Sequence, residues 1–202
     1  MDCCMESLTI KPGKIIVIAA SSGAGKTTIV HVLCDYFKNK HPLFRVVTYT
    51  TRVARAGEVD GIDYHFVSLK EFEQKIKEGF FVEWSSAYGA YYGTPRSIID
   101  ATNAGMSFLL VLDRSGVRQL LSLYKDKIVP IWISTSKDNL ASRLQSRGTE
   151  TKKEYIFRLN LAEEEQLAEM NNPLFSYHVQ NDQLGESINI LIRIITKELE
   201  II

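Results

Sequence analysis

The sequence predicts an α/β protein in which helices cover both faces of a parallel sheet. Three apolar runs have the composition of strands that are buried on both faces, at residues 14–19, 108–112 and 127–134. A segment in which apolar residues recur with helical spacing follows each run. Because strands and helices alternate along the chain, we expect a three-layer αβα core with a parallel sheet.

The chain is expected to divide into a core and an inserted unit. The core would comprise residues 13–44 and 105–202, where the long strands and helices lie. Residues 45–104 carry shorter strands and helices, so we expect them to fold as a small α+β unit that binds a substrate. Residues 1–12 show no such pattern, and we expect a flexible tail there.

Local signals set boundaries around the inserted unit. Ser68 and Glu71 have the spacing of a capping box, which predicts a helix starting at the next residue after Ser68. A strand is expected over residues 44–49. Pro95 suits the first turn of a helix that would run to about Asn103.

Composition excludes several classes of protein. The chain has 202 residues, is 45% hydrophobic and has a formal net charge of zero, so no basic surplus favours nucleic acid as a partner. No apolar run approaches the roughly 18–20 residues that span a bilayer, and the first residues do not resemble a signal peptide. Three cysteines suggest a reducing compartment rather than a disulfide framework. We therefore expect a cytoplasmic protein without a membrane partner.

The segment Ala20–Thr27 has the layout of a phosphate-binding loop, because it joins an apolar strand to a helix through small residues. Small residues let backbone N–H groups approach phosphate oxygens, and the helix N-terminus adds a partial positive charge. Lys26 can reach the β and γ phosphates, and the Thr27 hydroxyl can bind Mg²⁺. The first position is Ala20 instead of Gly, which predicts that the backbone there lies in an ordinary φ/ψ region. The loop predicts a nucleoside triphosphate with Mg²⁺.

Arg52 and Arg55 lie three residues apart among small residues, in an expected loop. Guanidinium groups bind phosphate dianions in a bidentate manner, and Tyr64 and Tyr92 could add phenolic donors. The alternative is a pair of solvated surface charges.

Two carboxylates follow apolar strands and each has two interpretations. Glu83, beside Trp84, could accept two hydrogen bonds from the Watson–Crick edge of guanine, or it could point into water. Asp113 could orient Mg²⁺ through water, or it could cap the next helix, and both roles are compatible. For Glu83 the residue types alone do not decide.

Three arginines, Arg143, Arg147 and Arg158, flank a break between two expected helices. Their side chains could close over a triphosphate and offset charge on the transferring phosphoryl group. The alternative is a solvated helix face.

Taken together, these stretches resemble the guanylate kinase family from about Gly13 to the last helix. The most specific run, Thr50–Val67, follows the family pattern T-T-R-x-x-R-x-G-E-x-x-G-x-D-Y-x-F-V. The resemblance implies a P-loop core, with residues 45–104 as a unit that binds GMP and residues from about 140 to 160 as a helical lid.

The resemblance also implies roles for individual residues. Catalysis would involve Lys26, Arg52, Arg143, Arg147 and Arg158. ATP would contact Ser22, Gly23, Ala24, Gly25, Lys26, Thr27, Thr28 and, beside the adenine, Asn181. GMP would contact Thr48, Arg52, Arg55, Tyr64, Glu83, Tyr92, Thr94 and, near the ribose, Asp113. Mg²⁺ would be bound by Thr27 directly and by Asp113 through water.

The sequence departs from the family pattern near Asp113. The family usually has an acid two residues earlier and a Gln two residues later, where this chain has Val111 and Ser115. Ser134-Thr135-Ser136 stands where the family usually has Pro-Pro-Ser. These changes leave the assigned groups in place, but Val111 removes support expected for the metal.

The activity that the resemblance implies is phosphoryl transfer from MgATP to GMP or dGMP, with closure of the lid and the inserted unit. One alternative is a guanylate-kinase-like interaction module without catalysis, against which Lys26 and the arginines of the lid argue. Another is a kinase for AMP, UMP or dTMP, against which Glu83 and the Thr50–Val67 run argue. The sequence leaves open whether the protein is a monomer or a homodimer.

Overall fold

The computed structural model describes residues 11–20, 24–87, 89–147 and 152–201, without the side chains at 144, 146, 147, 152 and 154. Within these residues, a five-stranded sheet has the order β2-β7-β1-β8-β9. All of its neighbouring strands are parallel. The strands are β1 (Ile15–Ala20), β2 (Leu43–Arg45), β7 (Ser107–Val111), β8 (Ile128–Ser134) and β9 (Tyr177–Gln180). The expected parallel α/β fold is confirmed.

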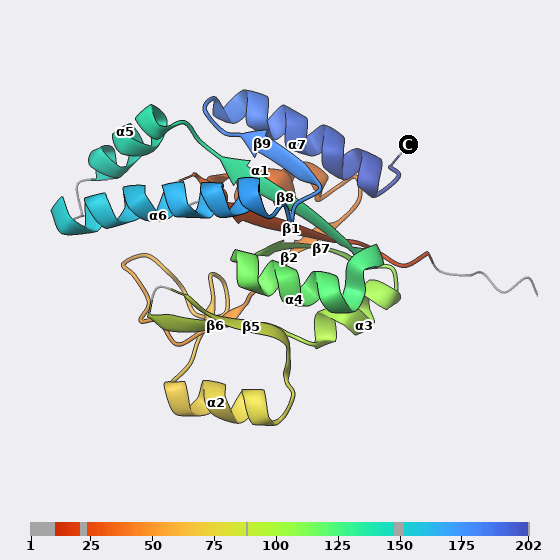
Figure 1. Ribbon diagram of the computed structural model, residues 1–202. Helices are drawn as coiled ribbons and strands as arrows, with labels where there is room; N and C mark the ends of the chain where they lie inside the picture. The colour runs from red at the N-terminus through yellow and green to blue at the C-terminus, as the bar shows by residue number, and fades with distance from the viewer. Residues whose placement is uncertain (1–10, 21–23, 88, 148–151, 202) are drawn as a thin grey trace, which may run out of the picture.

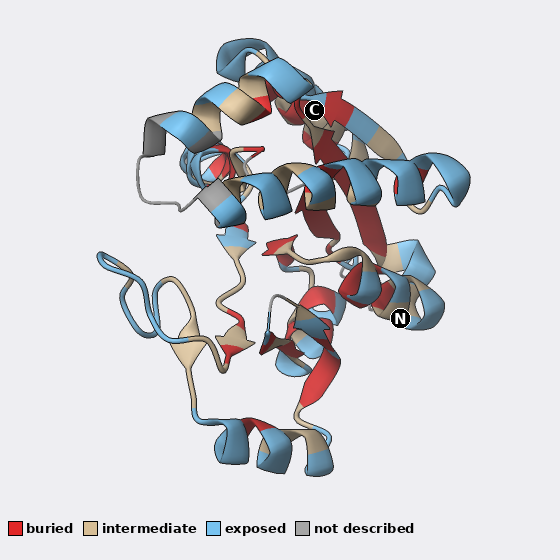
Figure 2. Ribbon diagram, turned by 60° about the vertical axis from the view of Figure 1, so that its left-hand side comes forward, coloured by how far each residue is buried: buried red, intermediate tan, exposed pale blue. Residues whose placement is uncertain are grey.

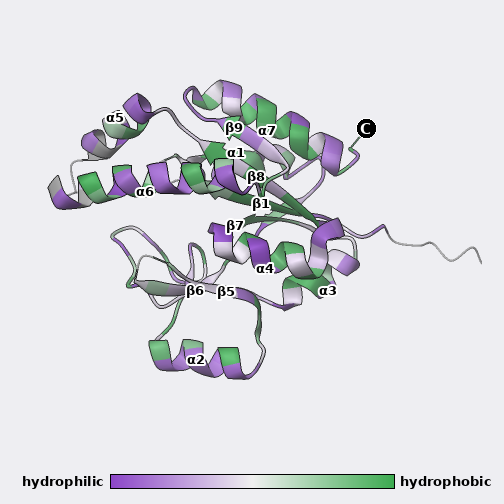
Figure 3. Ribbon diagram, viewed as in Figure 1, coloured by the Kyte–Doolittle hydropathy of each residue, from purple (hydrophilic) through white to green (hydrophobic). Residues whose placement is uncertain are grey.

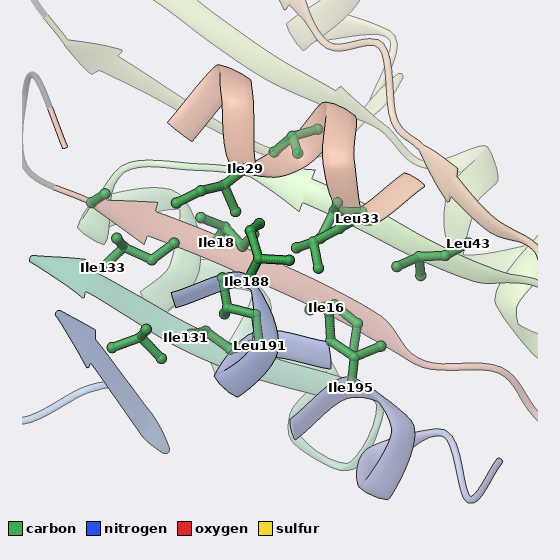
Figure 4. Close-up of a cluster of buried hydrophobic side chains, with 14 of the residues drawn as sticks. Ile16, Ile18, Ile29, Leu33, Leu43, Ile131, Ile133, Ile188, Leu191 and Ile195 are labelled. Atoms are coloured by element: carbon green, nitrogen blue, oxygen red, sulfur yellow. The ribbon is translucent and has the colours of Figure 1, made fainter. Parts of the chain in front are cut away.

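Helices cover both faces of this main sheet (Figure 1). One face carries α1 (Lys26–Phe37) and α7 (Leu184–Glu198), and the other carries α3 (Ser97–Asn103) and α4 (Arg114–Tyr124). Alternate residues of β1 point to opposite faces, so Ile16 and Ile18 pack with α1 and α7 (Figure 4). Ile15 and Val17 pack with α3 and α4 on the other side. β1 is therefore hydrophobic throughout, and Figure 3 shows the middle of the main sheet in green.

A second, four-stranded sheet with the order β4-β3-β6-β5 lies beside the core (Figure 1). Its strands are β3 (Tyr49–Thr50), β4 (His65–Phe66), β5 (Phe81–Ala87) and β6 (Ala90–Pro95), with α2 (Leu69–Lys77) packed outside. Figure 2 shows that α2 is mostly exposed, whereas the central strands β1 and β8 of the main sheet are almost entirely buried. The Ser68 hydroxyl accepts a hydrogen bond from the Glu71 N–H at 3.2 Å, as the capping box predicted.

Two expected boundaries are wrong. The strand expected over residues 44–49 is divided between the two sheets, because the chain crosses from one to the other. The N–H of Val46 donates to Leu109 O of the main sheet at 3.0 Å, and Thr48 O accepts from His65 N of the second sheet at 2.8 Å. Pro95 ends β6 in register with Phe81 instead of starting α3. Residues 44–49 contain no Gly or Pro that would mark the change of sheet.

Two helices, α5 (Lys137–Arg147) and α6 (Lys152–Asn171), project from the core above the second sheet (Figure 1). They share a small apolar cluster around Leu140 and Ala162. A 3-10 turn, η1 (Lys125–Lys127), leads into β8. Within the described part of the chain, none of the helices combines the length and apolarity that crossing a membrane would require.

Candidate active site

A cavity of about 370 Å³ lies where the core, the second sheet and α6 meet. Its wall takes residues from the start of α1, from β5 and β6, from the loop before β4, from the end of β7 and from α6. Another hollow of about 530 Å³ lies over α7, and it shares no residue with this cavity. The chemistry predicted from the sequence gathers at the first cavity and not at the second.

The phosphate-binding loop forms one end of the cavity. Ala20 ends β1 in register with Ile133, so this position has an ordinary backbone conformation, as its alanine predicted. Gly25 precedes α1 with φ 88°, a left-handed conformation that favours glycine. The Lys26 ammonium donates to Ala20 O at 2.6 Å, and Lys26 and Thr27 both line the cavity. The N-terminus of α1 therefore faces this space with the features of an anion site.

Asn181 supports the loop from behind. It is buried, and its side-chain amide donates to Ala24 O at 2.7 Å. Its Oδ1 accepts from the Ser187 hydroxyl at 3.0 Å, and its main-chain oxygen accepts from Arg143 at 2.7 Å. Both ends of the amide are therefore engaged in the protein, and Asn181 holds the loop while Arg143 is held against Asn181.

In the loop after β3, Arg52 and Glu58 form an ion pair, the Arg52 clasp. The Arg52 guanidinium donates to both Glu58 oxygens at 2.9 and 2.8 Å, and Glu58 also accepts from the Arg55 N–H at 2.7 Å. The hydrogen bond raises the pKa of Arg52 and lowers the pKa of Glu58. Arg52 also lies 5.4 Å from the centroid of the Tyr64 ring, which lies 6.0 Å from that of Tyr92. Arg52 is thus oriented rather than freely solvated.

Tyr64 adds a neutral donor to this part of the wall. Burial raises the pKa of its phenol, so the O–H stays protonated at neutral pH. Arg55 is exposed, yet it lines the same cavity as Tyr64 and Tyr92. Two guanidinium groups and two phenols on one wall suit a phosphate dianion.

Glu83 is only 2% exposed, so the interpretation in which it points into water is wrong. Its Oε1 accepts a short hydrogen bond from the Thr94 hydroxyl. Burial raises the pKa of Glu83 to about 7; the Thr94 hydrogen bond opposes this shift and the charge of Asp113 adds to it. Glu83 nevertheless lines the cavity, as does the buried Thr48. A buried carboxylate at a cavity wall is suited to a ligand that donates two N–H groups.

The close approach of α4 to Glu83 depends on Gly116. A Cβ atom at Gly116 would lie 2.5 Å from Glu83 Oε2, closer than atoms in contact allow. No other residue type has room at this position while Glu83 keeps its place.

Asp113 caps α4 and also faces the cavity. Its Oδ1 accepts from the Gly116 N–H at 2.9 Å, and its Oδ2 accepts from the Ser85 hydroxyl at 2.6 Å. It lines the cavity together with Val111, the residue that replaces the usual acid. The two interpretations of Asp113, helix cap and cavity carboxylate, are therefore compatible.

Comparison with known proteins agrees with this arrangement. Residues 12–198 match the sequence model of the guanylate kinase family, and the guanylate kinase of Carboxydothermus hydrogenoformans is 35% identical over 188 residues. The chain belongs to the guanylate kinase family. That alignment covers 92% of this chain and 89% of its relative. The guanylate kinase of Symbiobacterium thermophilum is 37% identical over 188 residues, covering 92% and 86%.

A solved guanylate kinase has the same fold. The crystal structure of guanylate kinase from Anaplasma phagocytophilum aligns with a TM-score of 0.73 and 26% identity. The alignment covers 93% of this chain and 87% of that chain. The resemblance read from the sequence is therefore confirmed at the level of family and fold.

Against this family background, the structure brings most predicted site residues to one cavity. Those in its wall are Gly25, Lys26, Thr27, Thr28, Thr48, Arg52, Arg55, Tyr64, Glu83, Tyr92, Asp113 and Arg158. Thr94 lies behind Glu83, and the wall does not include Ala24, Arg143 or Asn181. Ser22, Gly23 and the side chain of Arg147 lie outside the described residues.

Sequence reasoning missed three residues that shape this guanylate kinase site: Glu58, Ser85 and Gly116. Glu58 belongs to the family run, but the pattern does not show that it holds Arg52. Ser85 follows Glu83 by two residues on one strand, so alternation in β5 could have placed it on the same face. Gly116 carries no side chain, and only the three-dimensional structure reveals its contact with Glu83.

Proposed function

We propose that this chain transfers the γ-phosphoryl group of ATP to the 5′-phosphate of GMP or dGMP. The observation that carries the proposal is that Glu83, the Arg52 clasp and Lys26 face one cavity. One cavity is then lined by a carboxylate that would recognise the base, an arginine that would bind the acceptor phosphate and a loop that would bind the triphosphate. The family membership supports the same reaction.

The donor half of the proposed site is the phosphate-binding loop. Backbone N–H groups of residues 22–25 and the N-terminus of α1 would bind the phosphates of ATP. Lys26 would leave Ala20 O and reach the β and γ phosphates. Arg143, Arg147 and Arg158 on α5 and α6 would offset the charge that moves during transfer. Asn181 would lie at the adenine side while it holds the loop.

The acceptor half is the second sheet. Arg52, Arg55, Tyr64 and Tyr92 would hold the phosphate of GMP through charged and phenolic donors. Ionised Glu83 would accept from guanine N1–H and the 2-amino group, with hydroxyl groups of Thr48 and Thr94 beside it. Adenine has an acceptor at N1 and lacks the 2-amino group, so it would leave a buried carboxylate without donors.

The chemical step needs no covalent enzyme intermediate. An oxygen of the GMP phosphate forms a bond to the γ-phosphorus, while the bond from that phosphorus to the β–γ bridging oxygen breaks and ADP leaves. The residues of this chain align the two anions, screen their repulsion and exclude water.

Mg²⁺ fits the donors on this cavity. The Thr27 hydroxyl and the Asp113 carboxylate are oxygen donors, and both line it. Mg²⁺ in such sites takes few protein ligands and completes its octahedron with phosphate oxygens and water. When bound, Mg²⁺ would neutralise charge on the β and γ phosphates. Thr27 would bind it directly, and Asp113 would act through water.

Exclusion of water requires closure around both nucleotides. We propose that residues 45–104 and the lid, about residues 140–160, move toward a core formed by residues 13–44 and 105–202. The exposed α6 side of the cavity, where Phe157 and Arg158 lie, would then cover the substrates.

The test of catalysis is replacement of the loop lysine. In an assay that couples ADP release to GMP, Lys26→Ala should lower kcat at least ~100-fold, because a group that stabilises the transition state is lost. Lys38→Ala, at the exposed end of the same helix, should retain wild-type turnover. Near-normal kcat in Lys26→Ala would contradict the mechanism. A wild-type chain that binds GMP but releases no ADP would favour the interaction module.

A further inference from the structure

Ser85 links the two halves of the site at Asp113. It lies on β5 two residues after Glu83, so both side chains project from the same face of the strand. Ser85 is 7% exposed, lines the cavity and donates its hydroxyl to Asp113 Oδ2 at 2.6 Å. Asp113 follows β7 of the main sheet, so this hydrogen bond joins the second sheet to the core.

The hydrogen bond restrains a carboxylate that would otherwise be held at one oxygen only. The Gly116 N–H occupies one lone pair of Oδ1, and Ser85 occupies one lone pair of Oδ2. Each oxygen of an ionised carboxylate keeps a further lone pair for a donor. With both oxygens held, rotation about the terminal bond of Asp113 is blocked and the remaining lone pairs keep a fixed direction.

The residues just before Asp113 cannot orient its carboxylate. Val111 lines the cavity two residues earlier, where the family pattern has an acid, and Leu112 lies between them in the same wall. Neither apolar side chain can donate to or orient Asp113. An acid at position 111 would have ordered water near the metal, which Ser85 does not replace, but the Ser85 hydroxyl fixes the carboxylate of Asp113 itself from β5.

The position of β5 against α4 does not depend on Ser85. The Gln119 side chain donates to Trp84 O at 2.7 Å and accepts from Trp84 N at 3.4 Å, which ties the strand to the helix. Removing the Ser85 hydroxyl should therefore free Asp113 without moving the strand.

We propose that Ser85 is a positioning residue, whose hydroxyl holds ionised Asp113 in the direction that receives an O–H donor of the bound substrates. That donor is the ribose 2′-hydroxyl of GMP or a water on Mg²⁺. The inference rests on the proposed function, because Asp113 acts only when the substrates occupy the cavity.

The test compares Ser85→Ala, Ser85→Thr, Asp113→Asn and the double variant Ser85→Ala/Asp113→Asn by steady-state kinetics. Ser85→Ala should lower kcat/KM for GMP about tenfold, which is the scale of one hydrogen bond to a charged group. The KM for ATP should change less than about twofold, since the loss of one hydroxyl near the acceptor does not reach the triphosphate loop. Ser85→Thr should restore activity because it keeps the hydroxyl.

The double variant separates positioning from a structural effect. If Ser85 acts through Asp113, the double variant should be no worse than Asp113→Asn alone. Ser86→Ala is the matched control, because Ser86 is exposed on the other face of β5. Unchanged GMP kinetics in Ser85→Ala, or fold-losses that multiply in the double variant, would overturn the inference.

Two further arms identify the donor. If Asp113 receives the ribose 2′-hydroxyl, the defect of Ser85→Ala should disappear with dGMP. If it receives metal-bound water, the defect should persist with dGMP and shrink as Mg²⁺ is raised. A wild-type chain that does not phosphorylate GMP would overturn the proposed function and this inference together. An active wild type whose GMP kinetics are unchanged by Ser85→Ala would overturn the inference alone.

Discussion

For Glu83, burial opposes the charged form that its proposed function needs. Burial favours its neutral form, with a pKa of about 7, whereas guanine recognition needs the carboxylate. Because this pKa is higher folded than unfolded, the folded empty chain binds more protons and loses stability as pH rises from about 4.5 to 7. Guanine donors would offset this burial of charge, so binding of GMP should expel the proton.

This conflict predicts a pH-dependent KM for GMP. Raising the pH from 6 to 8 should lower the KM up to roughly tenfold, since the ionised fraction of Glu83 increases through its pKa. The GMP phosphate also ionises near pH 6 and contributes in every variant. Steady-state kinetics of wild type and Glu83→Gln separate the two, because only the wild type should show the Glu83 component. Identical pH profiles would show that Glu83 does not read the base.

Gly116 gives a second prediction at the residue scale. Gly116→Ala should raise the KM for GMP at least tenfold, because a Cβ would displace Glu83 Oε2. The helix itself should tolerate alanine, which is favoured over glycine by up to ~1 kcal/mol in a helix. The KM for ATP and the far-ultraviolet circular dichroism should stay near wild type.

Gly185→Ala is the control for that variant. Gly185 is also a helical glycine, in the first turn of α7, and nothing lies within 4 Å of the position its Cβ would take. Its KM for GMP should equal that of the wild type. An unaltered KM for GMP in Gly116→Ala would mean that GMP binding does not require Glu83 to keep its observed position.

At the scale of elements, two carboxylates anchor the α5–α6 pair to the core: Asp182, which is partly exposed, and Glu169, which is buried. Asp182 accepts from Thr135 Oγ1 at 2.9 Å and from Ser136 N at 2.8 Å, just before α5 begins. The hydrogen bonds, led by that of the Ser136 N–H, lower the pKa of Asp182. These hydrogen bonds hold the segment before α5 to the loop after β9.

Glu169 is the second of these carboxylates, near the end of α6. It is 4% exposed and accepts from Arg114, from His178 at 3.0 Å and from Leu174 N at 3.0 Å. Burial raises the pKa of Glu169, but these hydrogen bonds outweigh it and the pKa lies below the ordinary value. The end of α6 is thus tied through Arg114 to the start of α4, next to Asp113.

Breaking this link should destabilise the protein. Arg114→Met should lower the free energy of unfolding by about 3 kcal/mol, because it leaves a buried carboxylate without its charged partner. Lys137→Met removes a similar ion pair whose side chains are 80% and 52% exposed, and should cost less than ~1 kcal/mol. Urea unfolding measures both. Equal, small losses would show that the backbone N–H groups satisfy Glu169 without Arg114.

Elements that depend on local patterns could be predicted from the sequence, and those that depend on tertiary contacts could not. The apolar runs of β1 and β8 and the capping box of α2 follow local rules, and the structure has them. The passage from β2 to β3 is not marked in the sequence, because residues 44–49 contain no Gly or Pro and the two sheets need the same residue types. Pro95 likewise satisfies both a strand end and a helix start.

For the whole molecule, the candidate site could be largely predicted because its groups lie in recognisable runs. The loop at Lys26 has the pattern of a triphosphate-binding loop, and the Thr50–Val67 run has the guanylate kinase pattern that implies GMP. The supporting contacts could not be predicted, since Ser85 to Asp113 and Gly116 to Glu83 join segments about 30 residues apart. Asn181 shows the same limit, because its position in the sequence suggested a ligand contact but did not reveal that its amide also bonds Ala24 O and the Ser187 hydroxyl.

The arrangement of the molecule explains how two substrates meet. The core holds the triphosphate loop, the second sheet holds the acceptor groups, and α6 contributes Phe157 and Arg158 to the space between them. In the proposed mechanism both outer parts approach the core for the reaction, and the choice of acceptor base should depend on Glu83 of the second sheet and on Gly116 of α4, which leaves room for it. The identity of the accepted monophosphate therefore tests the account as a whole.

A panel of nucleoside monophosphates with ATP and Mg²⁺, followed by ADP release, tests this claim most directly. GMP should support turnover, while kcat/KM for AMP, UMP and dTMP should be at least ~100-fold lower, because each leaves Glu83 without its two donors. Comparable turnover of AMP, or ADP release that no monophosphate stimulates, would contradict a guanine-specific phosphotransferase.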